Sequence, residues 1–254
     1  MMLPMPGDTL DGRCAVVTGA GRGFGERIAA ELDALGATVA VLDLDEAAAQ
    51  RSAAQLARGL AVACDVGDEA SVRAAFAAVR RELGTVDILV NNAGIVSTTH
   101  FLDLEEAEWD RVLRVDYTSM YLTCREVAAE MVAQRYGRIV NISSVAGKRG
   151  GGFIGRPAYA AAKAGVIGFT KALARELAPA GVTVNAVAPG AMDTEMTRML
   201  RDDSDLLARV VATIPLGERG TIQDVADTVV FLCSGAASYL TGETVDVDGG
   251  VLME

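Results

Sequence analysis

The stretch VVTGAGRGFGERIAAEL, Val16 to Leu32, passes from a short apolar run through four glycines into an alanine-rich amphipathic segment. This pattern predicts a strand, a turn and a helix in succession. A glycine in the turn can adopt positive φ, and its missing Cβ lets a ligand approach the backbone. The first N–H groups of the helix would then be available to an anion such as a pyrophosphate. The spacing is T-G-x-x-x-G-x-G rather than G-x-G-x-x-G, and a tight turn without a ligand also explains it.

Short apolar runs alternate with longer helical segments along the rest of the chain. Strands are predicted at 14–19, 38–44, 60–66, 86–94, 137–144, 182–190 and 243–250, and helices at 25–35, 46–57, 69–83, 109–135, 159–178 and 224–233. The strands are almost entirely apolar, as expected when helices cover both faces of a parallel sheet. We therefore expect an α/β protein with a single doubly wound, Rossmann-type parallel sheet of about seven strands, forming one domain over 1–254.

Composition limits the classes of partner. The 254 residues carry a formal net charge of −11, and an acidic surface repels the phosphates of nucleic acid. The four cysteines lie far apart and the chain has one histidine, so we expect buried thiols and no metal site. The N-terminus lacks a signal-peptide pattern, and no apolar run is long enough to span a bilayer. A soluble cytoplasmic protein without membrane contact is expected.

Asp43 ends the second predicted strand, about 20 residues beyond the glycines. A carboxylate there can accept hydrogen bonds from both hydroxyls of an adenosine ribose, and its charge repels a 2′-phosphate. The position therefore favours NAD over NADP. Arg22, inside the glycine turn, keeps NADP open because a guanidinium binds phosphate well. A helix-capping or turn role is the alternative for Asp43.

Tyr159 and Lys163, in the sequence YAAAK, share one face of a predicted helix. The pKa of a free tyrosine is near ~10, and a neighbouring ammonium lowers it. The pair can thus act as a general acid–base couple, although an ordinary helix face can carry the same spacing. Ser144 ends the fifth predicted strand, where its hydroxyl could hold a substrate oxygen or simply form a turn.

Eight motifs occur in order along the chain: TGAGRGFG (18–25), Asp43, CDV (64–66), NNAG (91–94), NISS (141–144), YAAAK (159–163), NAVAPG (185–190) and YLTGETVDVDGG (239–250). With these motifs the chain resembles the short-chain dehydrogenase/reductase family over almost its whole length. The resemblance implies that Tyr159 is the catalytic acid–base, that Lys163 assists it while binding the nicotinamide ribose, and that Ser144 orients the substrate oxygen.

The resemblance also implies a set of cofactor-binding positions. They are Gly19, Arg22, Gly23, Phe24, Gly25, Asp43, Asp65, Val66, Asn91, Ala93, Gly94, Tyr159, Lys163, Pro189, Gly190 and Thr194. Among them, Asp65 is expected at the adenine and Thr194 at the carboxamide. The cofactor expected is NAD, with NADP less favoured.

Asp116 departs from the family pattern, because many members carry an asparagine here that helps hold a water near the lysine. An amide both donates and accepts hydrogen bonds, whereas an ionised carboxylate only accepts them. Asp116 could still hold the water or could pair directly with Lys163. Its charge would raise the pKa of Tyr159, against the effect of the ammonium. We place Asp116 with the catalytic group and also consider it a tolerated replacement.

The interval between Ser144 and Tyr159 is a second departure, slightly longer than is common in the family. The extra length falls in 147–157, a segment expected to form one wall of the substrate pocket. Its basic residues are Lys148, Arg149 and Arg156. They could favour an anionic or polyol substrate, or they could form an ordinary solvated loop.

Three functions are compatible with these residues. The first is an NAD-dependent dehydrogenase of a secondary alcohol or polyol, or of the ketone in reverse. The second is a 3-oxoacyl-thioester reductase, which Asp43 mildly disfavours because such reductases usually take NADPH. The third is a dinucleotide-binding scaffold or sensor without catalysis, for which Asp116 is the only supporting feature.

Assembly and a substrate lid complete the expectations. Small residues along 159–178, together with 117–135, are expected to pack across a two-fold axis in a homotetramer. The segment 192–215 is expected to form a mobile lid. Its candidate apolar contacts are Met196, Met199, Leu200 and Leu207.

Overall fold

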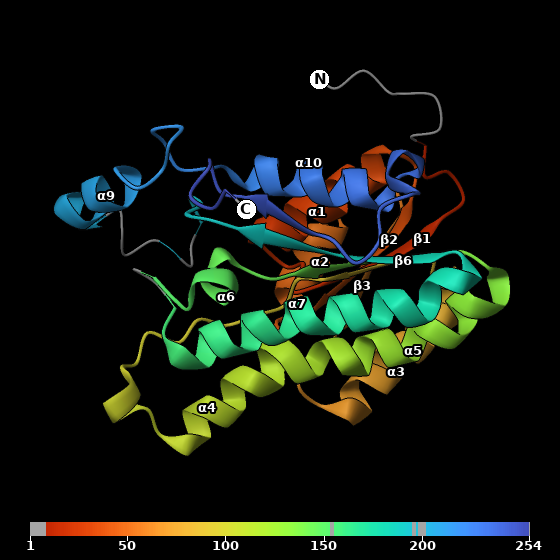
Figure 1. Ribbon diagram of the computed structural model, residues 1–254. Helices are drawn as coiled ribbons and strands as arrows, with labels where there is room; N and C mark the ends of the chain where they lie inside the picture. Colours follow the sequence, from red (N-terminus) through yellow and green to blue (C-terminus); the bar gives the residue numbers. More distant parts are fainter. Residues whose placement is uncertain (1–8, 153–154, 195–196, 198–201, 254) are drawn as a thin grey trace.

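The computed structural model describes residues 9–152, 155–194, 197 and 202–253. Over these residues the strands form one parallel sheet in the order β3-β2-β1-β4-β5-β6-β7 (Figure 1). The strands are β1 (Cys14–Thr18), β2 (Thr38–Asp43), β3 (Gly59–Ala63), β4 (Ile88–Asn91), β5 (Gly137–Ile142), β6 (Val182–Pro189) and β7 (Thr244–Val247). The predicted doubly wound sheet is confirmed.

Helices cover both faces of the sheet (Figure 1). One face packs against α1 (Gly23–Ala34), α2 (Glu46–Ala53) and α10 (Ile222–Cys233), and the other against α3 (Glu69–Leu83), α5 (Ser119–Gln134) and α7 (Pro157–Leu177). Shorter elements are η1 (Phe101–Asp103), α4 (Glu106–Leu113), η2 (Arg114–Thr118), α6 (Val145–Arg149), η3 (Ala178–Ala180), α9 (Ser204–Val211) and η5 (Gly235–Ala237).

Strand β1 shows why the predicted strands are apolar on both sides. Ala15 and Val17 pack into the core cluster shared with α1 and α10. Val16, pointing the opposite way, packs into the cluster shared with α3 and α5. All three side chains are fully buried, and each buried valine stabilises the fold by roughly 1.5–3 kcal/mol. The central strands thus anchor two cores at once.

The strand order reverses at β1. Strand β2 pairs with one edge of β1 and β4 with the other, where Val17 lies opposite Val90. In an open parallel sheet, the loops after two such strands run in opposite directions and leave a crevice at their carboxyl ends. The glycine turn follows β1 and the NNAG motif follows β4, so both predicted cofactor-binding motifs lie at this crevice.

The predicted helix at 109–135 is interrupted. Helix α4 passes into a π-helical segment, η2, before α5 begins. The hydrophobic periodicity of the sequence did not reveal the π-helical segment, because a π-turn holds only one residue more than an α-helical turn. The predicted helix at 159 begins earlier, at Pro157, since a proline at the first turn needs no N–H partner.

Cys14, Cys64, Cys124 and Cys233 are buried free thiols, and burial raises the pKa of Cys124 to about 12. In the described part of the chain, no three His, Cys, Asp or Glu side chains gather as metal ligands would. None of the helices described there has the length and hydropathy to cross a bilayer.

Candidate active site

Thr18, the last residue of β1, joins the glycine turn to the end of β4. Its Oγ1 accepts hydrogen bonds from the backbone N–H groups of Asn92 at 3.0 Å and Ala93 at 3.1 Å. The Asn92 side chain donates in return to the carbonyls of Thr18 and Gly19, each at 2.9 Å. A Cβ on Gly19 would lie 2.8 Å from Ala93 Cα, so only glycine permits this approach.

The N-terminus of α1 fits an anionic ligand. Arg22 is the N-cap residue, and its side chain caps none of the first N–H groups. Gly23 has a φ of +64°, and no atom lies within 4 Å of where its Cβ would be. Gly23 therefore leaves room for a ligand beside the positive end of this 12-residue helix. Backbone and dipole together suit the pyrophosphate of a dinucleotide.

Asp43 lies beside the same turn. Its Oδ2 accepts the Gly21 N–H at 2.8 Å, and its Oδ1 accepts the Asp45 N–H at 3.0 Å. A Cβ on Gly21 would lie 2.9 Å from the carboxylate, so the contact requires glycine. Each carboxylate oxygen retains acceptor capacity, and Asp43 can still accept from a ribose hydroxyl.

Asn91 has a structural role in its side chain. The Asn91 amide donates to Asn141 Oδ1 at 2.9 Å and accepts from Thr123 Oγ1 at 2.7 Å. Asn141 in turn donates to Thr170 Oγ1 at 2.9 Å. This buried network ties β4 and β5 to α5 and α7. Only the backbone of Asn91 is left for the predicted cofactor contact.

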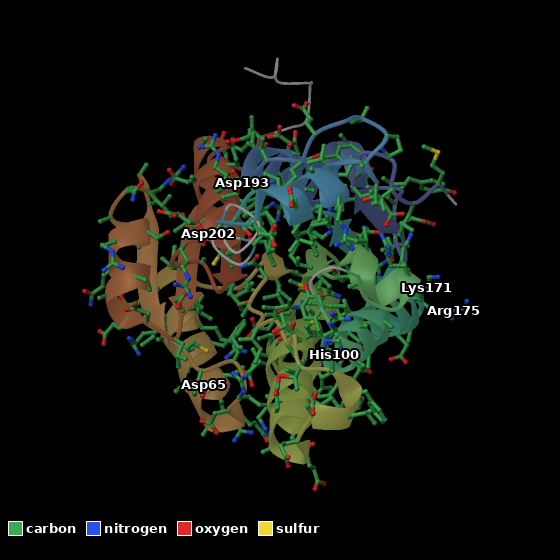
Figure 2. All side chains as sticks on the ribbon, turned by 90° about the vertical axis from the view of Figure 1, so that its left-hand side faces the viewer. Asp65, His100, Lys171, Arg175, Asp193 and Asp202 are labelled. Atoms are coloured by element: carbon green, nitrogen blue, oxygen red, sulfur yellow. The ribbon has the colours of Figure 1, made fainter. Side chains whose placement is uncertain are left out.

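The other predicted cofactor positions surround the carboxyl edge of the sheet. Figure 2 views the molecule from this side and shows Asp65 and Asp193 far apart on it. Arg22 and Asp65 are exposed, and Asp65 Oδ1 accepts the Gly67 N–H at 2.9 Å. The half-buried positions are Phe24, Ala93, Gly94, Gly190 and Thr194, and the buried ones are Gly25, Val66 and Pro189.

Ser144, Tyr159 and Lys163 come together just beyond the carboxyl end of β5. Ser144 is the N-cap of α6 rather than the last strand residue, and its Oγ accepts the Ala146 N–H at 3.1 Å. The Ser144 and Tyr159 hydroxyls are hydrogen-bonded. Lys163 Nζ lies 5.6 Å from the centre of the Tyr159 ring and donates to the Ile142 carbonyl at 3.0 Å. The predicted acid–base couple and its serine thus share one site.

Three small residues that sequence reasoning missed set this geometry. Ser143 Oγ donates to the Lys163 carbonyl at 2.8 Å and fixes α7 on the end of β5. A Cβ on Gly147 would lie 2.6 Å from the Lys163 carbonyl carbon. Gly155, with φ of +88°, would place a Cβ 2.6 Å from Tyr159 Cδ1. In the sequence these glycines look like ordinary loop residues, because the contacts that require them are tertiary.

Asp116 enters the site from the π-helical turn. Its side chain is fully buried, its Oδ1 accepts the Ile95 N–H at 2.8 Å, and its Oδ2 lies 3.3 Å from Lys163 Nζ. A Cβ on Gly94 would lie 3.2 Å from this Oδ2, so Gly94 leaves room over the pair. Of the two arrangements expected, direct pairing with Lys163 is the one present.

Four effects, two raising and two lowering, set the pKa of Tyr159. Burial raises the pKa of the phenol, and the Lys163 ammonium lowers it. The Asp116 carboxylate raises this pKa, and the hydrogen bond from Ser144 lowers it. Burial likewise raises the pKa of Asp116, opposed by Lys163. The raised pKa of Tyr159 favours the protonated phenol, the form that donates a proton to a carbonyl oxygen.

The basic segment 147–157 does not act as one patch. Lys148 Nζ pairs with Asp246 Oδ2 of β7 at 2.7 Å, and both side chains are largely buried. We therefore withdraw Lys148 as a substrate-binding cation. Arg156 is the N-cap of α7 and donates its backbone N–H to Ser97, whereas Arg149 is exposed.

The segment 192–215 begins beside the site. Asp193 donates its N–H to the Gly220 carbonyl at 3.0 Å and pairs with Arg219 at 3.1 Å. Thr197 Oγ1 accepts the Thr194 N–H at 3.1 Å. Helix α9 extends away from the sheet at the left of Figure 1, with Leu207 half-buried. The candidate contacts Met196, Met199 and Leu200 lie outside the described residues.

Comparison with known proteins gives full-length relatives. A family model described as Enoyl-(Acyl carrier protein) reductase matches residues 19–252. The 3-oxoacyl-(acyl-carrier-protein) reductase FabG of Escherichia coli (strain K12) is 44% identical over 244 residues, which is 96% of this chain and 98% of the relative.

Solved structures agree in fold. The structure of a putative gluconate dehydrogenase from Agrobacterium tumefaciens is 36% identical, with a TM-score of 0.93 over 97% of this chain and 98% of that one. A putative short-chain alcohol dehydrogenase from Sinorhizobium meliloti 1021 is also 36% identical, with a TM-score of 0.91 over 96% and 98% of the two chains. All three relatives cover nearly the whole of this sheet and site.

Proposed function

The chain belongs to the short-chain dehydrogenase/reductase family, and from this premise we propose that it reduces the 3-oxo group of an acyl thioester to a 3-hydroxyl. It is an oxidoreductase that uses a nicotinamide cofactor. The single observation that carries the substrate class is the 44% identity to a 3-oxoacyl reductase over 98% of that relative's length. This observation favours the second of the functions considered from the sequence over an alcohol or polyol dehydrogenase.

The chemistry proposed for the chain's own residues follows from their positions. Ser144 turns its one hydroxyl proton from Tyr159 to the 3-oxo oxygen and orients it, while its Oγ accepts the Ala146 N–H. Tyr159 donates its proton to that oxygen as negative charge develops there. Lys163, one turn further along α7, acts on the phenol through its positive charge, which lowers the pKa of Tyr159. A bound reduced nicotinamide supplies the hydride that completes the reduction.

Asp43 leads us to propose NADH as the preferred form of the cofactor. Its carboxylate already accepts the Gly21 N–H at 2.8 Å, which fixes it beside the glycine turn. A 2′-phosphate placed there would meet a negative charge, whereas a ribose hydroxyl would meet an acceptor. The exposed guanidinium of Arg22 is the feature that would favour NADPH.

Assembly and lid remain proposals of the same kind. We propose a homotetramer, supported by the exposed aromatic side chains Tyr117 and Tyr121 along η2 and α5. Light scattering coupled to gel filtration tests it.

We propose 192–215 as the substrate lid, supported by the attachment of Asp193 to Gly220 at its start. The domain assignment, one unit over 1–254, is supported by the single sheet.

The test of the proposed function is a substrate panel. The purified protein is assayed with NADH and NADPH in parallel against acetoacetyl-CoA, simple ketones and ketoses, and cofactor binding is measured separately by calorimetry. We expect the highest kcat/KM with the 3-oxoacyl thioester. Tyr159→Phe is expected to lower kcat by about 10²- to 10⁴-fold with cofactor binding retained.

Other outcomes decide against the proposal. A higher kcat/KM for a ketose or simple ketone would support the polyol or alcohol reading. Tight cofactor binding without turnover of any compound would support the scaffold reading. Unchanged kcat in Tyr159→Phe would remove the assigned proton donor.

A further inference from the structure

Asp116 and Lys163 are two opposite charges with almost no access to solvent. Asp116 is 0% exposed and Lys163 is 3% exposed. Their closest atoms, Asp116 Oδ2 and Lys163 Nζ, are 3.3 Å apart. An isolated buried charge is costly, so removing either side chain would leave the other as an uncompensated charge. The Lys163 ammonium, which the family resemblance pairs with Tyr159, therefore also interacts with the Asp116 carboxylate.

The backbone holds Asp116 in this position. The π-helical turn Arg114–Thr118 sets Asp116 between two regular helices, a local irregularity that often marks functional positions. The Ile95 N–H donates to Oδ1 at 2.8 Å, which leaves Oδ2 directed at the ammonium. Gly94 adds no side chain above the pair.

The carboxylate weakens the electrostatic effect of the ammonium on the phenol. An ammonium alone acts on a nearby phenolate as a full positive charge, whereas an ion pair acts as a dipole whose potential is much smaller. The described groups that face Tyr159 are Lys163, Asp116 and the hydroxyl of Ser144. Arg111, exposed on α4, is the only other cation that acts on Asp116 among the described residues.

We propose that Asp116 is a positioning residue which, by engaging Lys163, keeps the Tyr159 hydroxyl protonated to a higher pH than a neutral side chain would. The proposal deepens the function above and rests on Tyr159 as the proton donor. Carbonyl reduction requires the phenol, so its rate falls as pH rises through the pKa of Tyr159. Alcohol oxidation requires the phenolate, so its rate rises through the same pKa. Both limbs should therefore lie at higher pH in the wild type.

The thermodynamic limit on this effect is clear. At any one pH, the ratio of kcat/KM in the two directions is set by the equilibrium of the reaction and not by the enzyme. Asp116 can therefore move the pH at which the two profiles bend, but only in both profiles together, and it cannot change their ratio at any one pH. The prediction concerns the position of those bends, which a purely structural aspartate would leave in place.

The decisive experiment titrates Tyr159 itself. Phenolate absorbance is followed against pH for the wild type, Asp116→Asn and Asp110→Asn, each minus its Tyr159→Phe counterpart. Asp116→Asn removes one charge at nearly constant volume, and Asp110→Asn makes the same change on the exposed surface of α4. We expect the Tyr159 midpoint to fall by about one pH unit in Asp116→Asn only, which is a tenfold change in phenolate at neutral pH.

Turnover gives a second readout. The alkaline fall in the reduction rate and the rise in the oxidation rate should both move down by the same interval in Asp116→Asn. A folded Asp116→Asn protein with an unchanged or higher Tyr159 midpoint would overturn the proposal. Should this variant not fold, Asp116→Ser takes its place, and a Tyr159 midpoint at or above the wild-type value in that variant contradicts the proposal.

The titration uses no substrate, so its outcome is separate from that of the proposed function. Failure to reduce 3-oxoacyl thioesters would leave the Asp116 result standing. A normal substrate panel with an unmoved Tyr159 midpoint would refute only the role of Asp116.

Discussion

Replacing Thr18 by valine removes one hydroxyl and almost no volume. In the native protein that hydroxyl accepts two backbone hydrogen bonds, from Asn92 at 3.0 Å and Ala93 at 3.1 Å. It also contacts the Val90 carbonyl at 3.4 Å, and the residue is 2% exposed. Valine has the same branched shape, so β1 keeps its packing. The change therefore isolates the joint between the glycine turn and the end of β4.

The expected loss of stability comes from the Asn92 and Ala93 N–H groups, which no longer have an acceptor. A buried N–H that loses its partner costs about 1–3 kcal/mol, and these two groups are partly buried, so water recovers some of that. We expect Thr18→Val to lower the free energy of unfolding by about 3 kcal/mol. Thr18→Ser keeps the acceptor and loses one methyl group, for which about 1 kcal/mol is expected. The difference between the two variants is thus about 2 kcal/mol.

Cofactor binding should separate the variants as well. Thr18 positions Gly19 against Ala93, both of which are predicted to contact the dinucleotide. A misplacement worth ~1.4 kcal/mol raises Kd about tenfold. We expect that increase in Thr18→Val and a Kd near the wild-type value in Thr18→Ser.

The assay is urea unfolding followed by circular dichroism at a fixed protein concentration, with calorimetric titration of NADH on the folded variants. The fixed concentration matters because an oligomer would make the transition concentration-dependent. Equal stability and equal affinity of the valine and serine variants would refute the reasoning. A loss of stability in Thr18→Val no larger than that in Thr18→Ser would do the same, since the two N–H groups would then not need the hydroxyl.

Three further perturbations test the surrounding structure. Asp43→Ser should raise the ratio of kcat/KM for NADPH to that for NADH, because the carboxylate no longer repels a 2′-phosphate; an unchanged ratio would exclude this role. Lys148→Met should cost about 2 kcal/mol in urea unfolding by leaving Asp246 unpaired, against less than ~0.5 kcal/mol for the exposed Arg149→Ala. Hydrogen bonds from the hydroxyls of Ser97 and Thr99 lower the pKa of Glu108 in the folded protein. The stability that Glu108 contributes is therefore fully present above the pKa of an unfolded glutamate, and it is lost as pH falls through the lowered pKa of the folded state. Glu108→Gln should therefore flatten the acid limb of stability against pH, and a parallel curve would contradict it.

Periodicity and local chemistry accounted for the sheet. Runs such as 14–19 and 182–190 are apolar on both sides, which only a strand between two helical layers requires. The glycines at 19 and 23 both adopt positive φ, as a turn built for close approach predicts. YAAAK placed Tyr159 and Lys163 on one helix face because an α-helix brings residues four apart together. For these features the information is local, so neighbouring residues suffice to predict them.

Other features depended on residues far apart in the chain. Thr18 and Asn92 are separated by 74 positions, and Lys148 and Asp246 by 98. The side chain of Asn91 turned inward to Asn141, and Lys148 paired with β7 instead of facing a substrate. A motif gives the identity of such residues but not which neighbour their polar atoms reach. Their partners are set by strand order, which the sequence expresses only through the whole fold.

The sequence by itself determined the parallel α/β sheet, the glycine turn and the pairing of a tyrosine with a lysine, because each follows from the chemistry of adjacent residues. Only the tertiary structure decided that Asp116 meets Lys163 at 3.3 Å out of reach of water. That contact requires a π-helical turn, the loop after β4 and helix α7 to converge. The Coulomb energy between charges depends on their separation and burial, and neither quantity exists until the chain has folded.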